Sequence, residues 1–306
     1  MLRTRAVALA TLATTALALT ACGSNSLDSG GGTTTSTTSS SSTTAAADAA
    51  LVAKLPAAVK AKGTIKIGVD SSYAPNEFLD TDGKTVIGMD VDIFDAVAAK
   101  FGMKTEWVTA SFDSIILGVN SGKYDIGVSS FTINKTREAK ANMVSYFSAG
   151  TQWATKAGNP GKVHPDDACG LAIGVQKGTV QIDDLTARSK KCTDAGKKPI
   201  QQIIEESQAK VTADVVSGKA TAMLADSPVC LYAVKQTNGQ LASLGDIYDS
   251  APYGFVLPKT ETDFSQAIAD ALTAINADGS YKAALAKWGN ASGAISTFTV
   301  NPPASS

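Results

Sequence analysis

The chain has 306 residues, a formal net charge of −1 and 44% hydrophobic residues. This length is enough for two modest domains or one large one. The balanced charge, without a basic run, argues against nucleic acid as a partner. No apolar run in the body of the chain approaches the roughly 20 residues that span a bilayer, so we expect the body not to cross a membrane.

The N-terminus has the features of a secretory signal peptide. Arg3 and Arg5 precede an uncharged run rich in Ala and Leu over residues 6–19, which is too short to cross a membrane. The run ends in LTAC, which resembles the bacterial lipobox, and this resemblance implies cleavage before Cys22 and a diacylglycerol on its thiol. The alternative is an ordinary secretory signal followed by a chance cysteine. We predict a signal peptide over residues 1–21 and an anchor at the extracytoplasmic face of the cell membrane.

The segment after the cleavage site is predicted to be a flexible tether. Gly, Ser and Thr dominate residues 23–46, and such a composition cannot bury enough apolar surface to offset the entropy of ordering. We assign residues 22–52 to the lipidated cysteine and this tether, whose average reach is about 30 Å. O-glycosylation of the tether stays open.

Cysteine usage fits an exported protein. Cys169 and Cys192 flank one predicted strand–turn–helix unit, and outside the cytoplasm a disulfide between them is expected, contributing roughly 3 kcal/mol. Cys230 is left over, and we interpret it as a small, buried apolar residue. No cysteine pair has the spacing of metal ligands, and His164 is the single histidine, in a polar loop before a proline. We therefore expect no metal site and no cofactor.

The elements expected in the first part of the body alternate between strand and helix. Apolar-rich or alternating segments predict strands at 64–70, 105–109 and 124–128, and helical spacing predicts helices at 91–101 and 112–120. A second series follows, with strands at 171–176, 201–204 and 220–225 and helices at 180–189, 208–217 and 228–236. A strand at 253–257 and helices at 263–276 and 281–288 complete the chain. This rhythm indicates an α/β protein with a mainly parallel sheet.

Six short motifs in one order resemble the family 3 solute-binding proteins, the polar amino-acid-binding proteins of ABC importers. The resemblance covers about residues 63–289, and Asn76 departs from it, because the family usually has Phe there. The motifs are IGVD to YAPNEF (67–78), GMDVDI (88–93), SGKYD (121–125), SSFTI (129–133) followed by Arg137, VQKGT (175–179), and ADGSY to KW (277–288).

The resemblance implies a two-lobed periplasmic-binding-protein-like fold (type II), with two α/β lobes joined by two hinge strands. The hinges would lie near residues 147–155 and 248–255, with the ligand in the cleft between the lobes. We assign residues 53–153 and 248–300 to the first lobe and residues 154–247 to the second lobe.

Three residues are expected to bind the carboxylate of an amino acid. Arg137 matches the family arginine, and its planar guanidinium can form two parallel hydrogen bonds; by charge alone it would be a surface residue. Thr132 could address the same carboxylate through its backbone N–H and hydroxyl. Thr179 begins a helix, where free N–H groups and the helix dipole favour an anion, although it could also be a plain N-cap.

The ammonium and the side chain of the ligand have their own expected partners. Asp226 follows a strand at its carboxyl end and resembles the family aspartate that binds the ammonium, with a helix cap as the alternative role. Ser130 would add a carbonyl or hydroxyl. Tyr73 and Phe112 match the aromatic positions that enclose the ligand side chain, although either could be a core residue. Asp70 could reach the distal end of the ligand.

The resemblance implies a function in transport. We expect a monomer without enzymatic activity that binds a polar L-amino acid and delivers it to an ABC permease with its ATPases. Glutamine, glutamate and basic amino acids all stay open as ligands. One alternative is a dehydratase of the same fold acting on a cyclic amino-acid-like acid, for which Glu77 is the obvious carboxylate, although we interpret it as structural. Another is the sensor domain of a receptor.

Overall fold

The computed structural model describes residues 47–304. The chain separates into two units, Met1–Ser42 and Thr43–Ser306, and every described residue belongs to the second. The predicted signal peptide, the predicted lipidation at Cys22 and most of the predicted tether lie outside the described residues. The last residues assigned to the tether enter helix α1 (Ala49–Lys54), which is capped by the side chain of Asp48.

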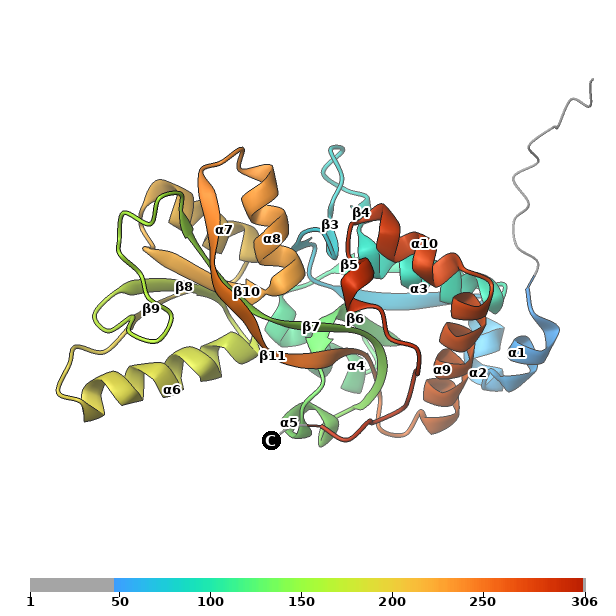
Figure 1. Cartoon of the computed structure of the whole chain (residues 1–306). Coiled ribbons are helices and arrows are strands. Elements are labelled where there is room, and N and C mark those ends of the chain that lie inside the picture. Colours follow the sequence, from blue (N-terminus) through green and yellow to red (C-terminus); the bar gives the residue numbers. More distant parts are fainter. Residues whose placement is uncertain (1–46, 305–306) are drawn as a thin grey trace, which may run out of the picture. The chain divides into compact units, whose positions relative to one another are not determined.

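An eight-stranded sheet runs through the described unit in the order β5-β1-β6-β11-β7-β10-β8-β9 (Figure 1). Strand β1 pairs in parallel with β5 and β6, and β8 pairs in parallel with β9 and β10. The expected α/β class is therefore confirmed, but the pairing is mixed rather than mainly parallel, because β6–β11, β11–β7 and β7–β10 are antiparallel. The strands are β1 (Thr64–Val69), β5 (Lys104–Thr109), β6 (Ile126–Thr132), β7 (Asn142–Lys156), β8 (Ala172–Gln176), β9 (Gln201–Glu205), β10 (Ala222–Asp226) and β11 (Leu241–Leu257).

Two long antiparallel strands connect the halves of this sheet. Strands β7 and β11 have 15 and 17 residues and pair with each other along most of their length. Strand β11 also pairs with β6, and β7 also pairs with β10, so both strands belong to both halves (Figure 1). We call the half with β1, β5 and β6 the first lobe and the half with β8, β9 and β10 the second lobe.

This is the expected fold of two α/β lobes joined by two strands. The segments predicted as hinges, residues 147–155 and 248–255, lie within β7 and β11. The pairing between β7 and β11 shifts register between Leu244 and Tyr248 and again between Tyr248 and Ala251. The predicted lobe limits, at residues 153/154 and 247/248, fall inside the same two strands.

The first lobe contains most of the helices. The C-terminal helices α9 and α10 pack against α3, so the end of the chain returns to the first lobe. A small sheet of β2 (Ser72–Tyr73), β3 (Glu77–Leu79) and β4 (Val86–Ile87) covers one end of the lobe. The helices are α1, α2 (Ala57–Lys62), α3 (Met89–Lys100), α4 (Ile115–Asn120), α5 (Lys135–Glu138), α9 (Thr262–Ala277) and α10 (Ser280–Lys287), with the 3₁₀ turns η1 (Phe112–Ser114) and η2 (Ala291–Gly293).

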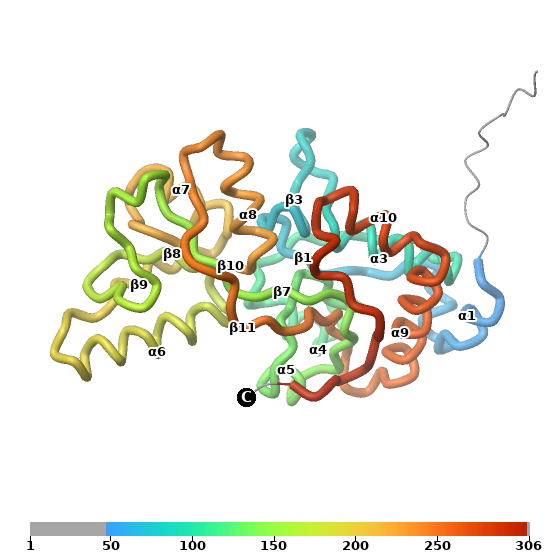
Figure 2. The backbone as a smooth tube through the Cα atoms, viewed as in Figure 1, coloured from blue at the N-terminus to red at the C-terminus, as the bar shows by residue number. Residues whose placement is uncertain are grey.

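The last residues of the chain run beside one hinge strand. Val300 forms a bridge with Val144, and the backbone N–H of Ser145 donates to the carbonyl oxygen of Thr299 at 2.9 Å. Figure 2 shows this red segment descending from α10 past β7. It therefore adds pairing to the first-lobe end of β7.

The second lobe contains α6 (Val180–Asp194), α7 (Gln208–Ser217) and α8 (Ser227–Gln236). Its core includes a disulfide between Cys169 and Cys192, which confirms the predicted pairing. Cys230 has a free, fully buried thiol on α8, as expected. Burial raises the pKa of this thiol to about 12, so it stays protonated and inert.

The main differences from the expected elements lie in the two long strands. Periodicity predicts no strand over residues 142–156, where only the family resemblance places a hinge, yet β7 covers this whole segment. For β11, periodicity predicts a strand only at residues 253–257, but the strand begins at Leu241. Residues 243–252 alternate poorly between buried and exposed positions and contain Gly245 and Pro252, so no strand pattern is visible in them. Pairing with β7, distant in sequence, makes this segment extended. Strand β6 likewise continues to Thr132, beyond the predicted end at residue 128.

None of the helices formed by residues 47–304 has the length and apolar character that a membrane span needs. Across the same residues, no group of three or more His, Cys, Asp and Glu side chains is arranged to bind a metal ion.

Candidate functional site

Seven of the eight side chains predicted to contact a ligand line one small cavity between the lobes. Its volume is about 10 Å³, which is room for about one water molecule. An amino acid can therefore enter only when the walls move apart. Asp70, the eighth predicted residue, lies outside this lining. The lining comprises Tyr73, Phe112, Ser130, Thr132 and Arg137 from the first lobe, and Thr179, Val180, Gln181 and Asp226 from the second.

Arg137 brings a buried positive charge to the cavity. It lies on α5, whose start is fixed by Asn134, because the Asn134 side chain accepts from the Arg137 backbone N–H at 2.9 Å. Arg137 is 8% exposed, and its guanidinium donates to the carbonyl oxygens of Thr132 at 2.8 Å and Gly178 at 3.1 Å. These bonds use two of its five N–H donors. The alternative of a surface arginine does not hold.

The charge of Arg137 has no anionic partner among residues 47–304. Across the described residues, no carboxylate lies within the 4.0 Å of a salt bridge from its guanidinium. Burial lowers the pKa of Arg137 to about 10, an effect that the negative charge of Asp226 partly opposes. The guanidinium is still protonated at pH 7, and a buried cation with free donors is a site for an anion.

Two phenylalanine rings hold the guanidinium in place. Phe112 and Phe131 stack with ring centroids 4.6 Å apart. The guanidinium carbon of Arg137 lies 5.3 Å from the Phe112 ring and 5.4 Å from the Phe131 ring, within the range of cation–π attraction. Phe131 was not among the predicted site residues. Its position beside Ser130 and Thr132 in the SSFTI motif was the available signal.

Helix α6 directs its N-terminus at the cavity. Thr179 is the N-cap of this 15-residue helix, but its side chain makes no capping hydrogen bond. The Thr179 hydroxyl donates instead to the Gln176 carbonyl oxygen at 2.7 Å. The first N–H groups of a helix have no partners within the helix, and here Val180 and Gln181 line the cavity. These groups and the helix dipole favour a carboxylate near Arg137.

Asp226 brings a buried negative charge to the same cavity. It is the N-cap residue of α8, yet its side chain makes no capping hydrogen bond, so the alternative of a plain cap does not account for the carboxylate. The carboxylate accepts from Gln181 Nε2 and from the Tyr253 hydroxyl, both at 2.8 Å. The Asp226 backbone N–H donates to the Tyr73 hydroxyl at 3.2 Å.

Asp226 also lacks an ionic partner among the residues that the structure describes. It is 6% exposed, and burial raises the pKa of its carboxyl, although hydrogen bonds from Tyr253 and Gln181 oppose that rise. Arg137 and Asp226 therefore place a cation and an anion on one cavity without forming a salt bridge. This arrangement is complementary to a zwitterion, whose two charges have the opposite signs.

Gln181 and Tyr253 are site residues that the sequence analysis missed. Gln181 bonds to both Asp226 and the hydroxyl of Thr151. Its place two residues after the GT of the VQKGT motif was a weak signal. Tyr253 lies on hinge strand β11, and no motif in the sequence distinguishes it from a core tyrosine.

Ser130 lines the cavity, but its hydroxyl already has hydrogen-bond partners within the protein. Ser130 has a left-handed backbone (φ 52°), and its hydroxyl accepts from Asn76 Nδ2 at 2.9 Å and lies within hydrogen-bonding distance of Glu77 and Asp90. The hydroxyl is thus used behind the cavity wall. Asn76, the residue that stands where the family usually has Phe, is fully buried and donates to Ser130.

Glu77 and Asp90 form a buried acidic pair beneath the site. Both side chains are fully buried, and burial raises both pKa values, that of Asp90 to about 6. Two carboxyls so placed disfavour each other's ionisation. The Tyr146 hydroxyl donates to Asp90, and the Ser129 hydroxyl donates to Glu77 at 3.0 Å. Glu77 does not line the cavity.

Asp70 follows β1 and lies just ahead of Tyr73. Its carboxylate accepts from the Ser72 backbone N–H at 3.0 Å and from Gln176 Nε2 across the lobes. Burial raises the pKa of Asp70. The Oε1 atom of Gln176 is buried and has no hydrogen-bond partner among the described residues. Two acceptors without a cation therefore lie together beside the site.

Comparison with known proteins identifies related sequences. The model of the bacterial extracellular solute-binding proteins, family 3, matches residues 65–291. The arginine-binding protein ArgT of Corynebacterium glutamicum is 33% identical over 250 residues, covering 81% of this chain and 82% of that protein. The L-cystine-binding protein TcyJ of Escherichia coli is 27% identical over 232 residues, covering 75% and 84% of the two chains.

Solved structures with the same fold include two ancestral binding proteins. An ancestral arginine-binding protein bound to arginine has a TM-score of 0.69 at 29% identity, covering 74% of this chain and 98% of its own. The ancestral amino acid-binding protein AncCDT-1, described as a precursor of cyclohexadienyl dehydratase, has a TM-score of 0.68 at 29% identity, covering 76% and 97%.

Proposed function

Because the chain belongs to family 3 of the bacterial extracellular solute-binding proteins, we propose that it captures a polar L-amino acid outside the cytoplasm and delivers it to an ABC permease and its ATPases. One observation carries this proposal: Arg137 and Asp226 are buried, oppositely charged and unpaired on one cavity. The protein would act as a monomer and would perform no covalent chemistry.

The cavity geometry supports one orientation of the ligand. The carboxylate would take the free donors of Arg137 and the N-terminus of α6, and the ammonium would contact Asp226. The ligand side chain would then pass between Tyr73 and Phe112. A closed site removes water from both charges, so each needs a partner of this kind.

We propose a basic side chain as the best fit, with glutamine and glutamate as the other candidates. A cationic head group would give Asp70 a counter-charge and would give Gln176 Oε1 the hydrogen-bond donor that it lacks among the described residues. Arginine-binding proteins among the relatives support the same choice. An amide could satisfy only part of this pair, and the carboxylate of glutamate would face Asp70 with like charge.

Binding would proceed by opening and closing of the lobes about β7 and β11. Arg137 and Asp226 come from opposite lobes, so a ligand that contacts both has greater affinity for the closed form and shifts the population toward it. The closed protein would then dock on the permease. The lipid on Cys22 would keep it at the extracytoplasmic face of the membrane.

Thermal unfolding against a panel of L-amino acids tests this proposal. Ligand at 100 times its Kd adds about 2.7 kcal/mol of stability, which corresponds to about 5–10 °C in Tm for a domain of this size. We expect the shift for a few polar amino acids, and its loss in Arg137→Ala. A flat response across the panel would contradict the amino-acid function.

The dehydratase alternative has a separate test. A dehydratase would need a carboxylate placed for proton transfer. Glu77 is buried and does not line the cavity, which supports a protein that binds its ligand without turnover. We expect no turnover of a prephenate-like substrate, followed by the absorbance of its aromatic product. Turnover that is lost in Glu77→Gln would establish the enzyme instead.

A further inference from the structure

The turn between β8 and α6 meets the first lobe outside the cavity. Lys177 Nζ lies 3.1 Å from Asp113 Oδ2 on η1 and 2.9 Å from Glu206 Oε1 in its own lobe. The next residue, Gly178, accepts a hydrogen bond from Arg137 across the lobes. None of Lys177, Gly178 and Asp113 lines the 10 Å³ cavity.

Gly178 lies against the first lobe more closely than a side chain would allow. A Cβ atom added there would lie 2.8 Å from the Asp113 Cβ, 3.2 Å from the Asp113 Cα and 3.5 Å from Phe112 Cδ1. These three nearest atoms all belong to the opposite lobe. A side chain at residue 178 would therefore collide with the first lobe only when the lobes are closed.

We propose that Gly178, Lys177 and Asp113 form a closure contact, which sets how long a ligand stays bound although none of the three touches it. This inference rests on the proposed function. Because Gly178 has no side chain, the lobes can approach until the Gly178 carbonyl oxygen accepts a hydrogen bond from the Arg137 guanidinium. The Lys177–Asp113 ion pair forms at the same point, with Lys177 oriented by Glu206.

The contact should act mainly on ligand release. A ligand first meets the open form, in which this contact is absent, so the association rate should change little. Closure then retains the ligand. If the methyl group of an alanine at position 178 prevents full closure, the ligand should dissociate sooner. The ion pair should contribute much less than Gly178, because Lys177 and Asp113 side chains are 47% and 31% exposed and exposed pairs are weak.

The test compares Gly178→Ala with Gly196→Ala in the purified protein. Both glycines have left-handed φ, 80° and 71°, so alanine is disfavoured at both positions for a similar reason. No heavy atom lies within 4 Å of a Cβ added at Gly196, which makes it a matched control. Affinity is measured by calorimetry and rates by stopped-flow fluorescence, with L-arginine, L-glutamine and L-glutamate as probes.

We expect Gly178→Ala to weaken binding by about tenfold or more, since overpacking of this kind has a substantial cost, with most of the change in the dissociation rate. Gly196→Ala should stay within about twofold of the unchanged protein, and both variants should unfold at similar temperatures. Unchanged affinity in Gly178→Ala would overturn the inference. Equal losses in both variants would also overturn it, because strain alone would then explain the effect.

A failure of the proposed function gives a different result. If the unchanged protein binds none of the three probes, the proposed function fails and the closure role fails with it. The ion pair is tested by Asp113→Asn, Lys177→Gln and the double variant. We expect each to weaken binding about two- to threefold, less at high salt, and the double variant to resemble either single one. Fully additive losses would overturn the ion-pair part.

Discussion

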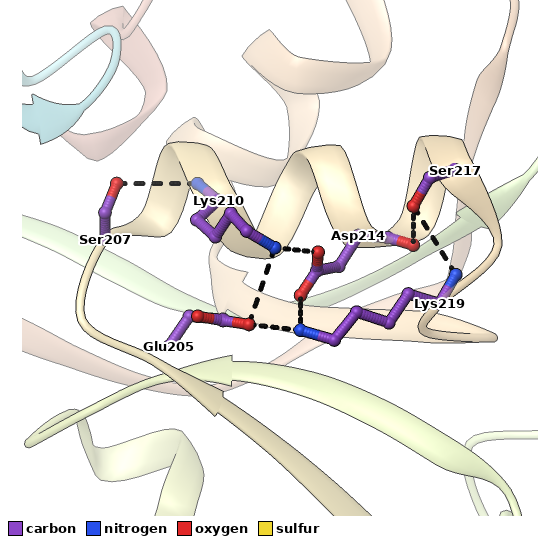
Figure 3. A network of polar contacts seen from close by, with 6 residues as sticks. All are labelled: Glu205, Ser207, Lys210, Asp214, Ser217 and Lys219. Atoms are coloured by element: carbon purple, nitrogen blue, oxygen red, sulfur yellow. Dashed lines mark hydrogen bonds and ion pairs between the residues drawn. The ribbon is translucent and has the colours of Figure 1, made fainter.

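Two groups of charged side chains in this protein differ in whether their charges are paired. On the second lobe, Lys210 and Lys219 each contact both Glu205 and Asp214 (Figure 3). This network joins the end of β9, helix α7 and the turn that follows it. Every charge in it has a partner of opposite sign within the protein.

In the cavity, by contrast, Arg137 and Asp226 are buried without an ionic partner among the described residues. The pKa values reflect the difference. Burial opposes the ionisation of Asp214, but hydrogen bonds from Lys210 and Lys219 outweigh it and lower the pKa of Asp214 to about 2. Burial raises the pKa of Asp226. Charges that the fold satisfies stabilise the fold, whereas charges left unsatisfied are available to a ligand.

The largest expected effect follows from removal of the cavity cation. Arg137→Ala should weaken ligand binding by about 100- to 1,000-fold, because the ligand carboxylate would be buried without its cation. The Tm of the unliganded protein should change little, because removal of a buried charge without a counter-ion offsets the loss of its two hydrogen bonds and two ring contacts. Calorimetric titration and thermal unfolding measure the two quantities.

Arg188→Ala is the matched control. Arg188 is a partly buried arginine of the second lobe whose Nε donates to Asp184 at 2.8 Å, and it does not line the cavity. Its loss should lower the Tm and leave affinity unchanged. Retained binding in Arg137→Ala would contradict the claim that the unpaired charges of the cavity bind the ligand.

Removal of the cavity anion should have the next largest effect. Asp226→Asn keeps the shape of the side chain but loses the charge that would pair with the ligand ammonium, so affinity should fall by about 100-fold. Calorimetry under the same conditions gives the ratio. An affinity within a few-fold of the unchanged protein would show that the ammonium binds elsewhere.

The two aspartates should give stability slopes of opposite sign with pH. The pKa of Asp214 is depressed to about 2, so its contribution is present above the unfolded value of about 3.9 and is lost as pH falls toward 2. The pKa of Asp226 is raised, so in the unliganded protein its ionisation disfavours folding as pH rises above about 3.9.

The raised pKa of Asp226 also predicts that ligand affinity falls in acid. Protonation of Asp226 removes the negative charge that faces the ammonium, so binding should weaken as pH falls through its raised pKa. Titrations between pH 7 and pH 4 should show this loss, and Asp226→Asn should reduce the slope to the part that Asp70, whose pKa is also raised by burial, contributes with a basic ligand. A slope that persists unchanged in Asp226→Asn would assign the effect to another group.

The smallest expected effect belongs to the surface network. Asp214→Asn should lower the Tm at pH 7 by about 2–4 °C, since its side chain is 3% exposed but its partners are half exposed. The difference should vanish near pH 2, and ligand affinity should not change. An affinity loss in Asp214→Asn would contradict the division between the two groups of charges.

Local patterns were enough to predict most of the fold. Periodicity placed α7 at residues 208–217, as observed, and the positions of Cys169 and Cys192 indicated their disulfide. Motif spacing also brought Arg137 and Thr179 to one cavity. These features depend on residues close in sequence or on an ordered set of motifs.

The missed features depend on contacts between distant segments. The first half of β11 is extended because it pairs with β7, and Tyr253 reaches Asp226 only because the hinge strand passes beneath the cavity. The hydroxyl of Ser130 is held by Asn76, Glu77 and Asp90 from another part of the lobe. The local sequence around β11, Tyr253 or Ser130 does not identify the distant segments that these elements contact.

One measurement tests most directly whether two unpaired charges bind the two ends of an amino acid. L-Arginine, agmatine and Nα-acetyl-L-arginine are titrated into the purified protein by calorimetry; if another amino acid gives the larger thermal shift, its corresponding derivatives are used. Agmatine lacks the carboxylate for Arg137, and the acetyl derivative lacks the ammonium for Asp226. We predict that the free amino acid binds at least about 100-fold more tightly than either derivative. Comparable binding of either derivative would contradict the account.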